Sequence, residues 1–99
     1  MIVYRATWIV REGKTEAEAM ELFKEFPPGG PKAVRVLGPT LGSPHRATLM
    51  FDFEFADMGA CEREWHAWLS DMGGNAFMDR WFTVCERNSG KAELWQLLQ

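Results

Sequence analysis

The side chains that could do chemistry in this sequence are its histidines, its single tyrosine and an arginine in the first apolar segment. His66 lies between Trp65 and Trp68, where an imidazole with a pKa near neutrality would serve as a general base at the edge of a cleft. The alternative is a surface or half-buried histidine that is hydrogen bonded to Glu62, one helical turn earlier. His45 follows a proline in a loop and is expected to be solvated.

Arg5 and Tyr4 are adjacent in the first apolar segment. A charge on an otherwise apolar strand face needs a carboxylate partner, and Asp52 or Glu54 can supply one. Arg5 would then hold an anionic substrate or stabilise a developing enolate, a role that Tyr4 also suits. The other interpretation of Arg5 is a structural ion pair at a subunit interface.

Five tryptophans in 99 residues are an unusual excess. They either pack the core and an interface or form the wall of a pocket for a flat hydrophobic ligand. Both interpretations remain open. The candidate substrate-binding residues are Trp8, Trp65, Trp68, Trp81 and Phe51, whereas Trp95 is expected at a subunit contact.

The sequence lacks the residue patterns of a metal site and of a phosphate-binding loop. Two histidines without metal-ligand spacing predict no metal site, and the paired glycines fit no phosphate-binding loop. We expect no cofactor. Cys61 and Cys85 are expected to be buried free thiols, which suits a reducing compartment. A net charge of −3 argues against nucleic acid, and no apolar run predicts a membrane span or signal peptide. We therefore expect a cytoplasmic protein.

Alternating and β-branched residues predict the strands that position these side chains. Segment 2–10 would direct Tyr4 and Trp8 to one face and Arg5 to the other, both faces being mostly apolar. The phenylalanine-rich alternation at 46–55 is the clearest strand. The remaining strands are predicted at 32–37 and 91–98, the latter in spite of its helical propensity.

Apolar residues at helical spacing predict the helices. A capping box at Thr15 begins the first helix, and Pro27 and Pro28 end it. Asp57 caps a second helix over about 58–72. Two glycines then interrupt the chain, and Asn75 caps a short third helix.

This order of elements predicts one α+β domain over 1–99, with a ferredoxin-like split βαβ topology and an antiparallel four-stranded sheet. The helices would cover one face of the sheet. The other face, apolar in the first strand, needs a second cover, and a second subunit would supply it. We therefore expect a homodimer.

The pattern resembles the dimeric α/β-barrel superfamily, which includes antibiotic biosynthesis monooxygenases and NIPSNAP-like proteins. The resemblance rests on the opening strand, the phenylalanine strand at 49–55, the tryptophan-rich helix at 64–69 and the closing segment at 90–97. It implies two ferredoxin-like sheets that close into a barrel across a two-fold axis. It also implies a small cleft between the helices and the sheet of each subunit.

The superfamily contains cofactor-free monooxygenases, haem-degrading enzymes, polyketide cyclases and isomerases, and fold alone does not choose among them. The first strand lacks the asparagine and the later helix lacks the histidine ligand that haem-degrading members carry. The resemblance thus implies a cofactor-independent monooxygenase acting on an aromatic or polyketide-like substrate, with His66 as the base. The alternative is a non-catalytic small-ligand-binding or interaction module, and a cyclase or isomerase is a weaker third option.

Overall fold

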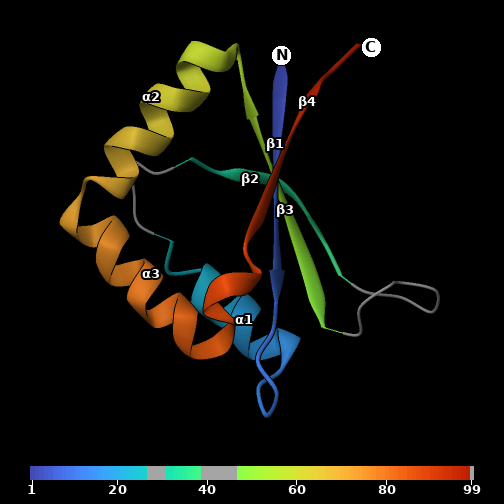
Figure 1. Cartoon of the computed structure of the whole chain (residues 1–99), viewed down its shortest axis with the longest axis vertical. Helices are drawn as coiled ribbons and strands as arrows, with labels where there is room; N and C mark the ends of the chain where they lie inside the picture. The colour runs from blue at the N-terminus through green and yellow to red at the C-terminus, as the bar shows by residue number, and fades with distance from the viewer. Residues whose placement is uncertain (27–30, 39–46, 99) are drawn as a thin grey trace.

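Within the residues that the structure describes, the protein forms a four-stranded sheet, three α-helices and a short 3₁₀ helix (Figure 1). The computed structural model describes residues 1–26, 31–38 and 47–98. In chain order the elements are β1 (Ile2–Ile9), α1 (Glu16–Phe23), β2 (Ala33–Leu37), β3 (Thr48–Phe55), α2 (Met58–Leu69), α3 (Met72–Val84), η1 (Arg87–Ser89) and β4 (Lys91–Gln96). The predicted helix end at Pro27 and Pro28 and the predicted solvated loop at His45 lie outside the described residues.

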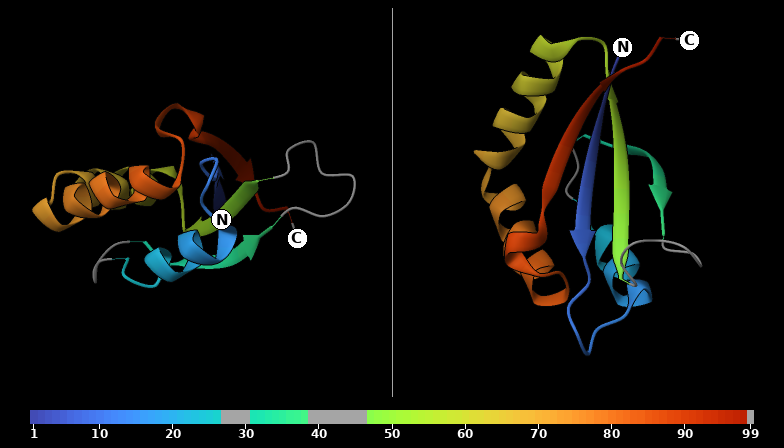
Figure 2. Two further views of the ribbon diagram at one scale, coloured as in Figure 1. Left: turned by 90° about the horizontal axis from the view of Figure 1, so that it is seen from below. Right: turned by 45° about the vertical axis from the view of Figure 1, so that its right-hand side comes forward.

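The strands lie in the order β2-β3-β1-β4, and every neighbouring pair is antiparallel. This is the split βαβ topology that the element order predicted, so the expected fold class is confirmed. The α-helices α1, α2 and α3 lie on one side of the sheet, and no helix of the described residues covers the opposite face (Figure 2). The described residues contain no helix that is long and apolar enough to cross a membrane.

The alternation of β3 determines which side of the sheet holds the core. Its inward side chains are almost fully buried beneath the helices, namely Leu49, Phe51, Phe53 and Phe55. The intervening residues therefore face the open side, because successive side chains of a strand point to opposite faces. Of these, Asp52 is nevertheless fully buried, because the side chains of Arg5 and Arg35 contact its carboxylate.

The first helix begins as its sequence predicted. The Thr15 hydroxyl accepts a hydrogen bond from the Glu18 backbone N–H at 3.1 Å, and the Glu18 carboxylate accepts one from the Thr15 N–H at 2.8 Å. These two bonds satisfy backbone donors that have no partner within the helix. Ala19 is fully buried and faces the core.

The boundary between the second and third helices differs from the prediction. The second helix ends at Leu69, and the third begins at Met72 with Asp71 as its N-cap, in place of Asn75. The Asp71 carboxylate accepts hydrogen bonds from the backbone N–H groups of Gly73 and Gly74. Two glycines in a first turn are tolerated there because a side-chain cap compensates for their low helix propensity.

The last segment, at 91–98, was predicted as a strand against its helical propensity, and this is confirmed. Residues Lys91–Gln96 form β4, an edge strand whose side chains are all exposed. It pairs with β1, and Ala92 lies opposite Ala6. Tertiary pairing thus overrides local preference at this position.

Candidate functional site

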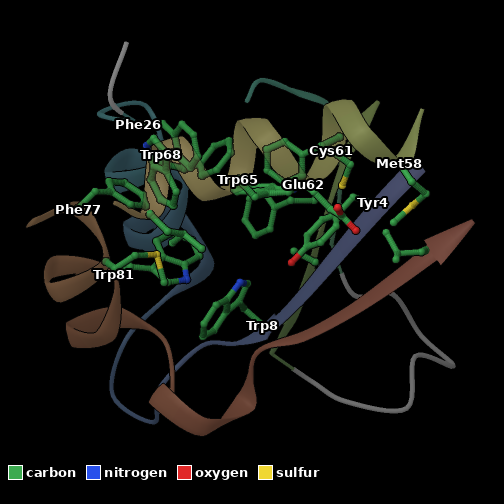
Figure 3. Close-up of a pocket in the computed structure, with 17 residues that line it drawn as sticks. Tyr4, Trp8, Phe26, Met58, Cys61, Glu62, Trp65, Trp68, Phe77 and Trp81 are labelled. Carbon is green, nitrogen blue, oxygen red and sulfur yellow. The ribbon is translucent and has the colours of Figure 1, made fainter. Parts of the chain in front are cut away.

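An aromatic cavity of about 500 Å³ lies between the sheet and the helices (Figure 3). Its wall is formed mostly by aromatic side chains from β1, β3 and all three helices. The lining residues are Tyr4, Ala6, Trp8, Phe23, Phe26, Phe51, Phe53, Met58, Cys61, Glu62, Trp65, Trp68, Leu69, Phe77, Met78, Trp81 and Leu94. We call this space the aromatic cavity.

The sheet forms the floor of the aromatic cavity. Tyr4, Ala6 and Trp8 alternate along β1 and therefore face the same side, while Phe51 and Phe53 face it from β3. The register places Ala6 directly opposite Phe51. Because Ala6 is small, it leaves space above the sheet between the two larger side chains of its strand.

The helices form the opposite wall through stacked and edge-to-face rings. Phe26 stacks on Trp68 with ring centroids 4.8 Å apart, and Phe77 stacks on Trp81 at 5.8 Å. Trp65 meets Phe53 edge to face at 4.9 Å. Such packed rings hold one another in place, so the wall is expected to keep its shape without a ligand.

Few polar groups reach the aromatic cavity. Burial raises the pKa of the Tyr4 phenol, and a smaller contribution comes from the neighbouring Cys61. Burial also raises the pKa of the Cys61 thiol, helped by the negative charges of Glu62 and Glu64. Both groups therefore remain protonated at neutral pH. Glu62 itself is exposed and lies at the edge of the lining, close to Tyr4 in Figure 3.

Two indole N–H groups in this wall lack partners. Within the described residues, the Nε1 atoms of Trp65 and Trp68 are buried and make no hydrogen bond. A buried donor without an acceptor costs free energy, and an acceptor on a bound molecule would relieve that cost.

The structure brings most of the predicted site residues together. Tyr4 and the five candidate substrate-binding residues all line the aromatic cavity. The lining also contains residues that the sequence did not single out as site residues, and Cys61 and Glu62 are those with ionisable side chains. Cys61 belongs to the same helical stripe as Trp65 and Trp68, so its position was foreseeable, whereas Glu62 lies one residue off that stripe.

His66 is not among the residues that line the aromatic cavity. Its side chain is exposed on α2, since a helical residue adjacent in sequence to Trp65 points about 100° away from it. This exposure agrees with the alternative of a surface histidine, although within the described residues no hydrogen bond joins His66 to Glu62. In this position the His66 imidazole would not contact a molecule bound in the aromatic cavity.

Arg5 lies on the opposite face of the sheet from the aromatic cavity. Its Nε and Nη2 atoms donate to the two carboxylate oxygens of Asp52 at 2.7 and 2.9 Å. Arg35 donates to the same carboxylate at 2.8 Å, which explains how Asp52 is fully buried on an open face. The hydrogen bonds from Arg5 lower the pKa of Asp52, and Arg35 adds to this effect. The predicted carboxylate partner is thus Asp52 and not Glu54.

The same ion pair acts on the arginine. The hydrogen bond to Asp52 raises the pKa of Arg5, so the guanidinium stays charged at neutral pH. Arg5 is therefore committed to a structural pair and is not directed toward a ligand in the aromatic cavity. No cluster of histidine, cysteine and acidic side chains suited to a metal ion occurs in the part of the chain that the structure describes.

The fold and the aromatic cavity together define a ferredoxin-like α+β protein with a pocket between its sheet and its helices. The sequence matches no protein-family model and no curated protein. Solved structures do match. An uncharacterized NIPSNAP domain protein from Burkholderia xenovorans superposes with a TM-score of 0.81 at 15% identity, over 98% of this chain and 94% of the other.

Two further structures extend this likeness. A NIPSNAP family protein from Agrobacterium tumefaciens has a TM-score of 0.77 at 15% identity, over 99% of this chain and 86% of its own. An antibiotic biosynthesis monooxygenase has a TM-score of 0.66 at 10% identity, with both chains covered in full. The protein thus has the fold of NIPSNAP domain proteins and of an antibiotic biosynthesis monooxygenase, as the sequence resemblance implied.

Proposed function

We propose that this protein is a small-molecule enzyme of the cofactor-independent monooxygenase type. Its substrate is a flat aromatic or polyketide-like molecule held in the aromatic cavity. The observation that carries this proposal is the cavity itself, since about 500 Å³ of open space walled by rings suits a fused-ring molecule. The likeness in fold to an antibiotic biosynthesis monooxygenase supports the reaction class.

The proposed reaction oxidises an acidic ring methylene that is conjugated with a carbonyl group through the aromatic ring system, as in anthrone. A base removes a proton and leaves a carbanion, which is delocalised as an enolate. The carbanion reduces dioxygen and forms a C–O bond, giving a peroxide that takes up a proton. Loss of water from this hydroperoxide leaves a ketone, so that R₂CH₂ and O₂ become R₂C=O and H₂O.

The groups that line the aromatic cavity suit two steps of this reaction. Glu62, at the edge of the lining, is the base that takes the proton. The Tyr4 hydroxyl, which is protonated, donates a hydrogen bond to the developing enolate oxygen. These assignments keep Tyr4 and replace His66 and Arg5, because neither of those side chains lines the cavity.

Oxygen uptake tests the proposal directly. With anthrone as the substrate, we expect the wild-type protein to consume one O₂ for each anthraquinone formed. Glu62→Gln is expected to lower kcat by about 100-fold or more, and Tyr4→Phe by about 10-fold or more. Glu64→Gln is the matched control, because Glu64 is exposed on the same helix and lies outside the lining. Equal rates in Glu62→Gln and Glu64→Gln would show that Glu62 is not the base.

A second candidate function is a non-catalytic binding module of the same fold. It is favoured by the scarcity of titratable groups among the lining residues and by the exposed position of His66. This function predicts that anthrone raises the melting temperature of the protein without oxygen uptake. Tight binding with no turnover would therefore select it over the enzyme.

We further propose that the protein works as a cytoplasmic homodimer. The open face of the sheet carries exposed apolar side chains, including Trp95 and Leu97, beside the Arg5–Asp52 pair. A second copy placed on this face would remove them from water. A reducing compartment would keep Cys61 and Cys85 as the free thiols that they are.

A further inference from the structure

A second cavity of about 440 Å³ adjoins the aromatic cavity. The two spaces share three lining residues on β1, namely Tyr4, Ala6 and Trp8. The rest of the second cavity is formed by η1 and the beginning of β4. Its remaining lining residues are Arg87, Asn88, Gly90, Lys91 and Ala92. We call this space the basic cavity.

Trp8 forms the wall between the two cavities. Its ring meets Trp81 edge to face at 6.3 Å and Phe82 at 5.9 Å. On the other side, a Cβ atom on Gly90 would lie only 2.6 Å from the ring, so this glycine allows the chain before β4 to lie against it. In Figure 3 the indole nitrogen of Trp8 is directed toward the interior of the aromatic cavity. The two cavities therefore meet along β1, at the three residues that line both.

The charged groups of the basic cavity are all cationic. Arg87 and Lys91 line it together with the Asn88 amide, and no carboxylate does so. This contrasts with a chain of net charge −3. The Arg87 guanidinium lies 4.8 Å from the centre of the Phe82 ring, which holds it beside the cavity.

These two cations are not neutralised by the protein. Within the described residues, neither Arg87 nor Lys91 forms an ion pair, whereas Arg5, Arg35 and Arg80 each pair with a carboxylate. The Arg87 guanidinium on η1, the Asn88 amide and the Lys91 ammonium at the start of β4 offer several hydrogen-bond donors to one acidic group. The positive charge would also attract an anion to the opening of the aromatic cavity.

We propose that the natural ligand is an amphipathic aromatic anion. Its flat apolar body occupies the aromatic cavity, and its acidic group, such as a carboxylate, binds Arg87, Lys91 and Asn88 in the basic cavity. This inference rests on the proposed function, because it names the substrate class of the same site. The aromatic cavity alone would accept a neutral ring system, whereas the basic cavity selects a ligand that also carries an acidic group.

Two fluorescent probes with one ring frame test the inference. Anilinonaphthalene sulfonate carries an acidic group, and N-phenylnaphthylamine is the same frame without it. We expect the double variant Arg87→Gln/Lys91→Gln to weaken sulfonate binding by about five- to tenfold and to leave the neutral probe within twofold. The matched control is Lys14→Gln/Lys32→Gln, which removes the same charge from exposed positions outside both cavities.

A third variant tests whether both probes bind where the two cavities meet. Ala6 lines both cavities, so the larger side chain of Ala6→Leu takes up space where they meet and is expected to weaken binding of both probes. Circular dichroism confirms that each variant is folded. If both double variants weaken the sulfonate equally, the effect is one of net charge and the basic cavity is not an anion site. If neither probe binds the wild-type protein, the proposed function itself fails.

Discussion

Asp52 joins two arginines of neighbouring strands on the open face of the sheet. Its carboxylate is fully buried and accepts hydrogen bonds from two arginines on neighbouring strands. The alternation of the sequence predicted that Arg5 needs an acidic partner, but Asp52 and Glu54 were equally eligible. Only the strand register, which places Arg5 directly opposite Asp52, decides between them.

Replacing this carboxylate is expected to destabilise the protein. Asp52→Asn leaves two guanidinium groups without their anion and should lower the free energy of unfolding by about 2 kcal/mol at pH 7. Glu54→Gln, an exposed change on the same strand and face, should alter it by less than about 0.5 kcal/mol. Urea denaturation of both variants measures the difference, and equal effects would contradict the structural role of the ion pair.

The pKa of Asp52 also predicts how stability depends on pH. The folded-state pKa lies below the unfolded value of about 3.9, so the stabilisation is present above about pH 4. It is lost as the pH falls through the folded-state pKa. The stability difference between the wild-type protein and Asp52→Asn should therefore shrink below pH 4. A difference that stays constant to pH 2 would contradict the pairing.

Cys61 provides a chemical reporter of the aromatic cavity. Burial raises the pKa of its thiol and raises that of Cys85 to about 12, so both react slowly with iodoacetamide at neutral pH. Because only Cys61 of the two lines the cavity, bound N-phenylnaphthylamine should slow its alkylation further and leave that of Cys85 unchanged. Mass spectrometry of the labelled peptides measures both rates. Unchanged labelling of Cys61 at saturating probe would place the probe elsewhere.

Among the elements, sequence periodicity predicted the strands better than the helix junctions. The alternation in β3 and the capping box of α1 are local signals, and the structure confirms both. The start of α3 was missed because Gly73 and Gly74 are typical of chain breaks, although an aspartate before them can cap a helix. The sequence placed His66 one residue off the apolar stripe of α2 and left open whether it reaches the cavity edge, since that depends on where α2 packs.

At the junction between α2 and α3, we expect a glycine-to-alanine substitution to be destabilising, contrary to helix propensity. A Cβ atom at Gly74 would lie 2.2 Å from the Trp68 carbonyl oxygen, so the backbone would have to shift. Gly74→Ala should therefore lower the free energy of unfolding by about 2 kcal/mol, although alanine is the better helix former. At Gly59 the nearest atoms belong to the flexible side chain of Arg63 and to the Asp57 carboxylate. Gly59→Ala should thus be neutral or stabilising in the same thermal melts, and equal destabilisation of both would contradict the close approach at Gly74.

In the molecule as a whole, large apolar side chains lie on both faces of the sheet. The aromatic residues on the helical side enclose a cavity, and four of the tryptophans contribute to it. Trp95 lies on the other face and is 56% exposed. The sequence predicted this division through strand alternation, whereas the size of the cavity depends on ring packing that no local pattern specifies.

The open face predicts the state of association. Sedimentation equilibrium at micromolar concentration should give a species of twice the 11.4 kDa chain mass. Trp95→Glu should shift this species to the monomer, because a charge would then be buried in the interface. Met72→Glu, at an exposed position on the helical layer, should leave it unchanged. A monomeric wild-type protein would contradict the proposed dimer.

The proposed function requires that the ligand binds in the aromatic cavity. A crystal structure of the protein with anthrone, in the absence of oxygen, tests this claim most directly. We expect the fused rings to lie between Trp8, Trp65 and Trp81, with the carbonyl oxygen within hydrogen-bond distance of the Tyr4 hydroxyl. Anthrone bound on the open face of the sheet, with the aromatic cavity collapsed onto its own side chains, would contradict it.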